Sequence, residues 1–393
     1  MLKILVNSRF GGGAEIQAAL LARTLGAEFL VLDGAGGLTP WGAGLPGALK
    51  TLQLPHYARR LAAVCGPGDT VLSFMQRSNF ANVLAARASG HRAVVCEVTQ
   101  PSREFTGLRG ALIKPLIRRL YPQAALTLAN SRGNARDLEE NFGFPPGKIK
   151  VIYNSCDTAA VAEQAAETLP AGYDAVFRRP ALITSGRLTA AKAHWRLLRI
   201  FAEVKKTVPE AALVFLGEGE LKRGLLCQCE DLHLAAHDAG GGSGPGAEDV
   251  FFAGFQANPF KFLARARLFA FTSLWEGLPN AVIEALACGL PVISADCRSG
   301  PRELLAPGTD PLAAAAAPEA TATGLLMPPF PASPPEFGTD ADAQEKLWAE
   351  KIKELLSDEA RLARLGGAAR ERAAAFAPGA KKAEWLEALG TDS

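Results

Sequence analysis

Short apolar runs rich in β-branched and aromatic residues alternate with longer segments of helical periodicity along most of the chain. This alternation is typical of parallel sheets whose strands are joined by crossover helices. The runs of the first half are residues 2–6, 29–32, 71–74, 93–96, 125–129 and 149–152. Those of the second half are residues 181–184, 212–216, 250–253, 268–272, 291–294 and, more weakly, 323–327. Each set suffices for its own doubly wound sheet, so the pattern predicts an α/β protein with two Rossmann-like domains.

The pattern also predicts where the domains meet. We place an N-terminal domain at residues 1–165, a second domain at 166–376 and a closing helical segment at 377–393, a candidate to pack back on the first domain. Two such domains facing each other form a cleft, with ligand sites at the carboxyl ends of the strands. Two stretches are predicted to be insertions. The Gly-rich residues 235–246 are expected to form a flexible loop, and the Ala- and Pro-rich residues 306–341 a long surface segment around one short strand.

Composition narrows the class without naming a ligand. Of 393 residues, 48% are hydrophobic and 21% charged, and the net charge of +2 gives no indication of a nucleic-acid partner. The 7 cysteines lack regular spacing, which favours reduced thiols. The N-terminal apolar run is too short for a signal peptide, and no window approaches the ~18 apolar residues of a membrane span. We expect a cytoplasmic protein, either free or at the inner face of the cell membrane.

The most informative stretch is Ser273–Asp296, which reads as strand end, loop, helix, glycine stop and strand. Pro279 suits a first helical turn because it lacks an N–H, and Gly289 suits the position after the helix. The amides near Asn280 and Ala281 then present the positive end of a helix dipole to a diphosphate.

Two carboxylates accompany that helix start, Glu276 in the loop and Glu284 about a turn into the helix. Alone they could be an acidic helix start. In the context Glu-Gly-Leu-Pro-Asn and Cys-Gly-Leu-Pro-Val, they resemble the Glu-x7-Glu signature of family-4 retaining glycosyltransferases of the GT-B fold. The resemblance implies that Glu276 contacts the donor sugar and Glu284 the nucleotide ribose. Gly277 and Leu278 belong to the same donor-binding loop.

A second match is Thr184–Lys192, a strand end that leads into a helix. Arg187 offers a planar fork to phosphate oxygens and Lys192 a mobile point charge. The family has Gly-Arg-Leu followed by a lysine here, which implies that Gly186, Arg187 and Lys192 bind the donor diphosphate. Ala193 stands where glycine or asparagine is frequent.

A third match is the glycine loop Asn7–Glu15, with Gly12 and Gly13 as donor-binding candidates. Gly11 and Gly13 fit a dinucleotide fingerprint but Ile16 breaks it, which argues against a Rossmann dehydrogenase. The family carries a comparable loop facing the donor; a tight structural turn is the alternative.

Weaker landmarks complete the predicted site. Gly217 lies in the stretch Phe215–Glu220, and Phe255 ends Val250–Phe255, whose backbone the resemblance puts beside the nucleobase. Many family members carry a histidine after the fourth strand of the first domain. This chain has none there, and Glu97 is the nearest polar candidate for the acceptor side.

Two other features have competing interpretations. Cys227, Cys229, His233 and His237 could form a metal site, or an incidental thiol pair before a flexible insertion. Residues 103–121 have leucines at helical spacing with interleaved Arg and Lys, typical of either an anchor on anionic lipid or a helix packed on the sheet, and Pro115 complicates a continuous helix.

We therefore predict a retaining glycosyltransferase that moves a hexose or N-acetylhexosamine from a UDP- or GDP-sugar to a glycan hydroxyl. The acceptor that we expect is a lipid-linked glycan in bacterial surface-glycan assembly. Its catalytic set is Arg187, Lys192 and Glu276, and the chemistry requires no cofactor or metal. The alternatives are a soluble small acceptor, a GT-B sugar-nucleotide epimerase and a non-catalytic nucleotide-sugar binder. No hydrolase, kinase or metalloprotease motif occurs in the sequence.

Overall fold

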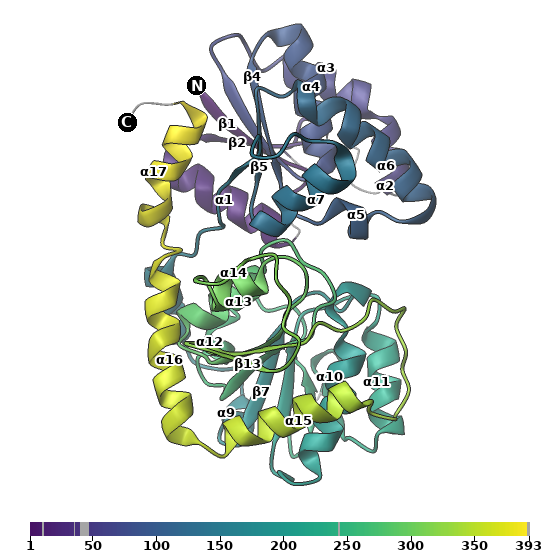
Figure 1. Ribbon diagram of the computed structural model, residues 1–393, viewed down its shortest axis with the longest axis vertical. Helices are drawn as coiled ribbons and strands as arrows, with labels where there is room; N and C mark the ends of the chain where they lie inside the picture. Colours follow the sequence, from purple (N-terminus) through teal and green to yellow (C-terminus); the bar gives the residue numbers. More distant parts are fainter. Residues whose placement is uncertain (10–11, 35, 40–46, 243, 391–393) are drawn as a thin grey trace. The chain divides into compact units, whose positions relative to one another are not determined.

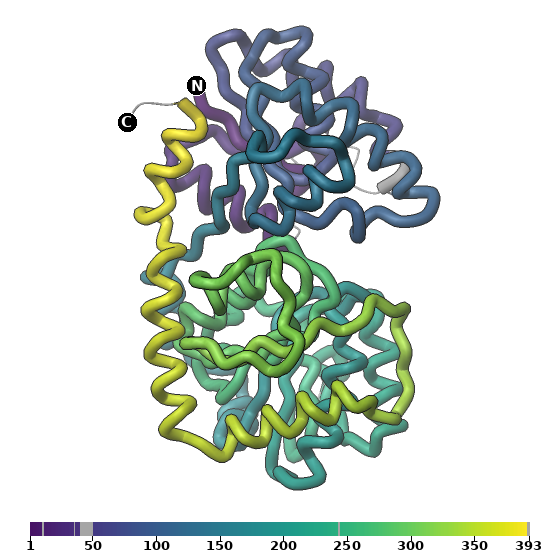
Figure 2. The backbone as a smooth tube through the Cα atoms, in the orientation of Figure 1, coloured from purple at the N-terminus to yellow at the C-terminus, as the bar shows by residue number. Residues whose placement is uncertain are grey.

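The computed structural model describes residues 1–9, 12–34, 36–39, 47–242 and 244–390. The chain divides into two compact units, Met1–Ser155 with Phe376–Ser393, and Cys156–Ala375 (Figures 1 and 2). Each unit holds one predominantly parallel sheet with helices, which confirms the predicted α/β class. The division precedes the sequence-based boundary at 165/166 because α8 (Thr158–Ala165) packs on two helices of the second unit, α12 (Phe260–Leu263) and α13 (Asn280–Ala287).

The sheet of the first unit has the order β2-β1-β3-β4-β5-β6, and every neighbouring pair is parallel. Its inner strands β1, β3, β4 and β5 are almost entirely buried on both faces, as is usual in parallel sheets, whereas the edge strands are partly exposed. The strands are β1 (Leu2–Val6), β2 (Glu28–Val31), β3 (Thr70–Phe74), β4 (Arg92–Glu97), β5 (Leu126–Ala129) and β6 (Lys150–Val151). The helices are α1 (Gly13–Leu25), α2 (Gly47–Leu52), α3 (Leu54–Ala62), α4 (Gln76–Ser89), α5 (Pro101–Glu104), α6 (Gly107–Leu120), η1 (Tyr121–Gln123) and α7 (Arg132–Phe142).

The C-terminal helix α17 (Pro378–Leu389) belongs to the first unit. Trp385 and Leu389 join the apolar cluster that contains α1, and the Trp385 ring lies 6.3 Å from that of Phe74. Arg92 donates to the carbonyl of Leu389, and Lys150 pairs with the Glu387 carboxylate at 2.8 Å. Residues from both ends of the chain therefore pack in the same apolar core.

The sheet of the second unit has the order β13-β14-β12-β11-β7-β8-β10-β9, in which only β13 runs antiparallel. Its strands are β7 (Ala181–Ser185), β8 (Ala212–Leu216), β9 (Ala236–Asp238), β10 (Val250–Phe252), β11 (Leu268–Phe271), β12 (Val292–Ala295), β13 (Glu319–Thr321) and β14 (Gly324–Met327). The helices are α8, α9 (Tyr173–Phe177), η2 (Ala190–Lys192), α10 (His194–Lys205), α11 (Lys222–Asp231), η3 (Ala239–Gly241), α12 (Phe260–Leu263), α13 (Asn280–Ala287), α14 (Pro301–Leu305), α15 (Ala343–Leu356) and α16 (Glu359–Ala374). From β7 the chain builds the sheet first toward β8 and later toward β11, so the topological switch point lies between β7 and β11.

The two predicted insertions hold more regular structure than expected. The glycine-rich segment contains β9, which pairs with β10, and the Ala- and Pro-rich segment contains two strands, β13 and β14, rather than one. Residues 328–342 are fixed by buried charges of α10 and α15. Arg199 donates to the Glu336 carbonyl at 2.7 Å, and Arg196 and Arg199 both pair with the fully buried Glu345. Composition alone cannot reveal such anchoring, because the partners are distant in sequence.

We expect Trp385→Ala to destabilise the first unit by about 3–5 kcal/mol, because it empties a buried aromatic site in the core. Urea unfolding followed by circular dichroism measures the loss. Lys382→Ala, on the exposed side of the same helix, is the matched control. Equal stabilities for the two variants would show that α17 contributes little to the core.

Candidate active site

The predicted diphosphate and sugar residues lie at the carboxyl ends of β7 and β11. These strands are parallel neighbours, with Leu182 opposite Leu268 and Ile183 opposite Phe269. The loops that follow them, residues 186–192 and 272–279, therefore leave the sheet at the same edge. In an open α/β sheet this switch point is the usual position of a ligand site.

The structure brings Lys192 and Glu276 into direct contact. The Lys192 Nζ lies 2.6 Å from Glu276 Oε1, and the side chains are 18% and 14% exposed. The same ammonium lies 4.9 Å from the centroid of the Phe271 ring, a cation–π contact from β11. The Thr272 hydroxyl donates to the Lys192 carbonyl at 2.9 Å, so the two loops are joined through backbone as well.

Glycines bring the neighbouring loops close together. Gly186 has φ +147°, and an added Cβ would lie 3.1 Å from Lys192 Cε. Gly217 has φ +140°, and its added Cβ would lie only 2.0 Å from the Gly186 carbonyl oxygen, a distance that no side chain permits. The Gly217 amide donates to the Gly254 carbonyl at 2.8 Å. The loops after β7, β8 and β10 thus meet as bare backbone, which allows a phosphate or base to approach closely.

Two predicted ligand contacts are exposed at this edge of the second unit. Phe255, just after β10, is 72% exposed. Arg187 is also exposed, and its guanidinium has no hydrogen bond or ion pair with the residues that the structure describes. Both side chains are accessible to a ligand.

The residues after Lys192 keep a conformation that favours glycine. Ala193 has φ +49° and ψ +39°, the left-handed region, at the start of α10. This explains why the resemblance has glycine or asparagine at the position. His194 follows, and burial lowers the pKa of its imidazole to about 3, so it stays neutral beside Lys192.

The helix start at α13 differs by one residue from the prediction. Pro279 is the N-cap residue, with extended backbone at φ −74° and ψ 105°, and Asn280 is the first helical residue. The Pro279 carbonyl accepts from the Val282 amide at 3.1 Å, which begins the helix after the proline rather than at it. Gly289 follows the helix with φ +73°, as predicted.

Glu284 lies within α13 and is partly exposed. Burial raises the pKa of its carboxyl to about 7, while the nearby Lys192 charge opposes the rise. Glu284 therefore holds a proton more readily near neutral pH than an ordinary glutamate does. A carboxyl in this state can both donate and accept hydrogen bonds.

Sequence reasoning missed the loop after β12. Ser299 has φ +105°, unusual for a residue other than glycine, and its hydroxyl donates to the Gly277 carbonyl at 2.9 Å. Gly300 has φ +92°, and an added Cβ would lie 2.5 Å from the same carbonyl oxygen. This loop fixes the backbone next to Glu276. The available signal was the turn sequence Ser-Gly-Pro, which three residues separate from the end of β12.

The predicted residues of the first unit have internal roles in the structure. The Gly12 amide donates to the Glu15 carboxylate at 3.0 Å and Gly13 begins α1, whereas Gly11 lies outside the described residues. Glu97 is fully buried and accepts from Gln76 at 2.9 Å. It also accepts from Tyr121 and Thr99, and burial raises the pKa of its carboxyl. With no exposed atom, Glu97 cannot touch an acceptor in this conformation.

The possible metal set is not assembled. Cys227 is exposed and Cys229 buried, so they occupy different sides of α11. In the part of the chain that the structure describes, no three His, Cys, Asp or Glu side chains gather as metal ligands would. Among the same residues, none of the helices has the length and apolar character needed to span a membrane.

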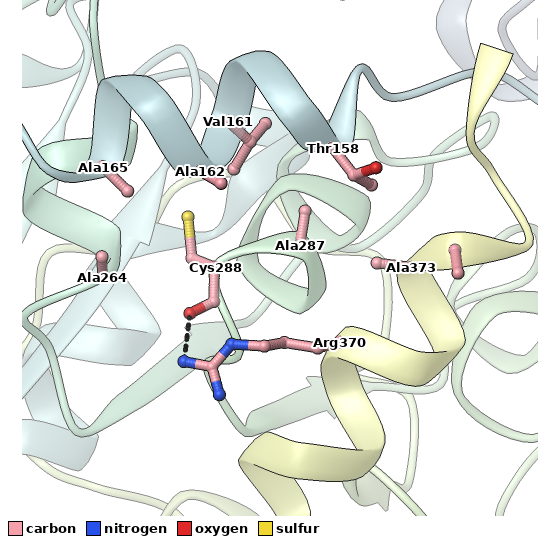
Figure 3. A pocket seen from close by; sticks show the side chains of 10 residues that line it. Thr158, Val161, Ala162, Ala165, Ala264, Ala287, Cys288, Arg370 and Ala373 are labelled. Carbon is pink, nitrogen blue, oxygen red and sulfur yellow. Dashed lines mark hydrogen bonds between the residues drawn. The ribbon is translucent and has the colours of Figure 1, made fainter.

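A cavity of about 390 Å³ lies at the opposite end of α13 (Figure 3). Small side chains of α8 and α16 line it, with Cys288 and Arg370 on its wall. The Arg370 guanidinium donates to the Cys288 carbonyl at 3.5 Å. None of the predicted donor-binding residues lines this cavity.

Comparison with known proteins agrees with the fold. The profile described as "Glycosyl transferases group 1" matches residues 179–327, and "Glycosyltransferase Family 4" matches residues 11–160. The chain is 37% identical over 262 residues to the N-acetylgalactosamine-N,N'-diacetylbacillosaminyl-diphospho-undecaprenol 4-alpha-N-acetylgalactosaminyltransferase of Campylobacter jejuni, a match that covers 65% of this chain and 66% of the relative. An uncharacterized glycosyltransferase of Methanocaldococcus jannaschii is 37% identical over 202 residues, or 51% of this chain and 47% of that protein. The crystal structure of Anabaena HepE in complex with UDP-glucose superposes with a TM-score of 0.73 at 19% identity, covering 100% of both chains.

The fold defines a GT-B type α/β protein, and the candidate site lies at the switch point of its second sheet. The chain belongs to the family-4-like glycosyltransferases, as its sequence motifs predicted. Its matches span just under two thirds of the Campylobacter relative and about half of the archaeal one.

We expect Glu284→Gln to stabilise the second unit at pH 8 and to change little at pH 5. Folding raises the carboxyl pKa from 4.5 to about 7, so the native state binds a proton that the unfolded chain has released. Stability is therefore lost as pH rises from about 4.5 through 7, by at most about 3 kcal/mol. The uncharged glutamine escapes this loss. Thermal unfolding of both proteins at pH 5 and pH 8 measures the difference in stability.

Glu203→Gln is the control, because it removes a carboxylate of α10 that pairs with Lys206 at the surface. Its stability should follow that of the unsubstituted protein at both pH values. If Glu284→Gln shows the same pH dependence as the unsubstituted protein, Glu284 does not titrate near neutrality.

Proposed function

We propose that the protein is a retaining, metal-independent glycosyltransferase that uses a UDP- or GDP-linked hexose or N-acetylhexosamine as donor. The observation that carries the proposal is the contact of Lys192 with Glu276 at the β7/β11 switch point, beside the start of α13. A phosphate site alone would require only the cation and the helix dipole. A carboxylate held in the same place suits the hydroxyl groups of a sugar.

In this proposal each end of the donor has its own residues. Arg187 and Lys192 bind the diphosphate, with Gly186 and Gly217 allowing backbone to approach it. Glu276, with the Gly277–Ala281 segment, binds the sugar and the adjoining phosphate. The ribose lies at Glu284, and the base beside Phe255.

The reaction proceeds by attack on the face from which the diphosphate leaves. The bond between the anomeric carbon and the diphosphate oxygen breaks, and the acceptor oxygen bonds to that carbon on the same face. The acceptor proton passes to the departing diphosphate oxygen. Arg187, Lys192 and the α13 dipole stabilise the charge that develops there, which supports a reaction without a metal. A covalent route is less suited, because Glu276 is engaged by Lys192 and Glu284 has a pKa near 7.

The proposed acceptor is a lipid-linked glycan in bacterial surface-glycan assembly, at the inner face of the cell membrane. Its support is the Campylobacter relative, whose name specifies a diphospho-undecaprenol acceptor. A soluble small acceptor is the first alternative. An epimerase would release an isomer without any acceptor, and a non-catalytic binder would hold the donor without turnover.

The surface of α6 supports a membrane contact. The helix is continuous through Pro115, and Ile113 and Ile117 bury one face of it in the first unit. On the other side Leu108 is 93% and Leu112 40% exposed, one helical turn apart, with exposed Arg109 and Arg119 nearby. Exposed leucines flanked by arginines suit an interface with anionic lipid.

We expect the protein to bind and slowly hydrolyse at least one sugar nucleotide in a panel of UDP- and GDP-sugars. Lys192→Ala should then lower the turnover of that donor by about 10²–10³-fold, because it removes charge stabilisation of the leaving group. Lys206→Ala, a surface lysine of the same region of sequence, is the control. No binding to any donor would contradict the proposal, and full activity of Lys192→Ala would remove that residue from the site.

We expect the double variant Leu108→Glu, Leu112→Glu to bind vesicles containing phosphatidylglycerol about tenfold or more weakly, because it replaces apolar contacts with repelled charges. Vesicle co-sedimentation measures the change. Leu312→Glu changes a 45% exposed leucine of the second unit and should bind normally. Equal binding by all three proteins would exclude α6 as the membrane contact.

A further inference from the structure

The two cations of the proposed diphosphate site are not equivalent. Lys192 is held by Glu276 at 2.6 Å, whereas Arg187 has no side-chain partner among the described residues. A diphosphate can therefore engage Arg187 directly. To engage Lys192 fully, it has to replace the Glu276 carboxylate.

When a diphosphate takes the place of Glu276 at Lys192, the Glu276 carboxylate loses its ion-pair partner. The carboxylate is only 14% exposed, so water cannot fully replace the ammonium. Removing one partner of such a buried pair is costly because the remaining charge is uncompensated. The incoming phosphate adds a second negative charge close to it.

The surrounding residues do not relieve this charge. Asp296, at the end of β12, is already neutralised by Arg302 at 2.6 Å. Cys297 lies near both Glu276 and Lys192, and burial keeps its thiol protonated by raising its pKa. Ser299 is directed to the Gly277 carbonyl, which fixes the loop on which Glu276 stands.

We propose that Glu276 makes the site selective for an intact nucleotide sugar over the corresponding nucleoside diphosphate. This inference rests on the proposed function. The hydroxyl groups of a donor sugar can bind the carboxylate that the diphosphate displaces from Lys192. A nucleoside diphosphate has no such hydroxyl groups, and its terminal phosphate carries more negative charge than the esterified one. The ion pair thus favours binding of the nucleotide sugar. It weakens binding of the nucleoside diphosphate, the product that remains after transfer.

Glu276→Gln tests this selectivity. The amide keeps the shape but frees Lys192, so the affinity for UDP should rise about tenfold, equivalent to about 1.4 kcal/mol. The affinity for UDP-N-acetylgalactosamine should stay the same or fall, because the amide is a weaker partner for hydroxyl groups. Calorimetric titration measures the dissociation constants of both ligands. The constant for UDP divided by that for the sugar nucleotide should be at least tenfold lower in Glu276→Gln than in the unsubstituted protein. If the donor panel shows that the protein binds GDP-sugars instead of UDP-sugars, GDP and GDP-mannose are titrated in place of UDP and UDP-N-acetylgalactosamine.

Two further variants make the result specific. Glu203→Gln also removes one carboxylate and should leave both affinities unchanged, which controls for net charge. Glu276→Asp keeps the negative charge and should retain a preference for the sugar nucleotide. Thermal unfolding establishes that each variant is folded before titration.

The outcomes separate the two proposals. If the unsubstituted protein binds no sugar nucleotide, the proposed function fails. If it binds the donor but Glu276→Gln leaves the UDP affinity unchanged or lowers it, the proposed function stands and the selectivity inference is overturned. The same holds if Glu203→Gln tightens UDP as much as Glu276→Gln.

Discussion

The parallel pairing of β7 with β11 is the constraint on which the candidate site depends. Strands far apart in sequence become neighbours there because the chain returns to β7 after building the sheet toward β8 and β10. The loop that ends at Lys192 and the loop that holds Glu276 consequently start from the same sheet edge. Without that crossover, an ammonium and a carboxylate separated by 84 residues would not meet at 2.6 Å.

Close backbone approach is the second constraint, and it follows from the first. The loops after β7, β8, β10, β11 and β12 crowd the carboxyl edge of the second sheet, so there is little room between them. Gly217 meets the Gly186 carbonyl, and Gly300 meets that of Gly277, at distances that exclude any side chain. The glycines therefore permit the fold of the site as well as the approach of a ligand. Their substitution would alter loop positions even in the absence of donor.

The sequence predicted the elements of this arrangement better than its contacts. Apolar runs located the strands of the core because buried parallel strands are continuously hydrophobic. The motifs named Lys192, Glu276 and Glu284 because those residue types suit phosphate and hydroxyl groups. The contact of Ser299 with Gly277 and the internal burial of Glu97 could not be predicted, since both depend on which loops become neighbours. The same is true of β9, whose pairing with β10 overrides a glycine-rich composition.

Charge balance links the fold to the chemistry of the site. Around the carboxyl edge of the second sheet, Asp296 is neutralised by Arg302, while Glu276 is neutralised by Lys192. Only the second of these pairs lies where the family motifs put the diphosphate. Its ammonium also lies 4.9 Å from the centroid of the Phe271 ring, a second contact that remains when the carboxylate is displaced. A site of this kind is organised before the donor binds, and the cost of rearrangement falls on Glu276 alone. If Glu276 binds the donor sugar as proposed, the residue that recognises the sugar is also the residue whose release from Lys192 the sugar has to compensate.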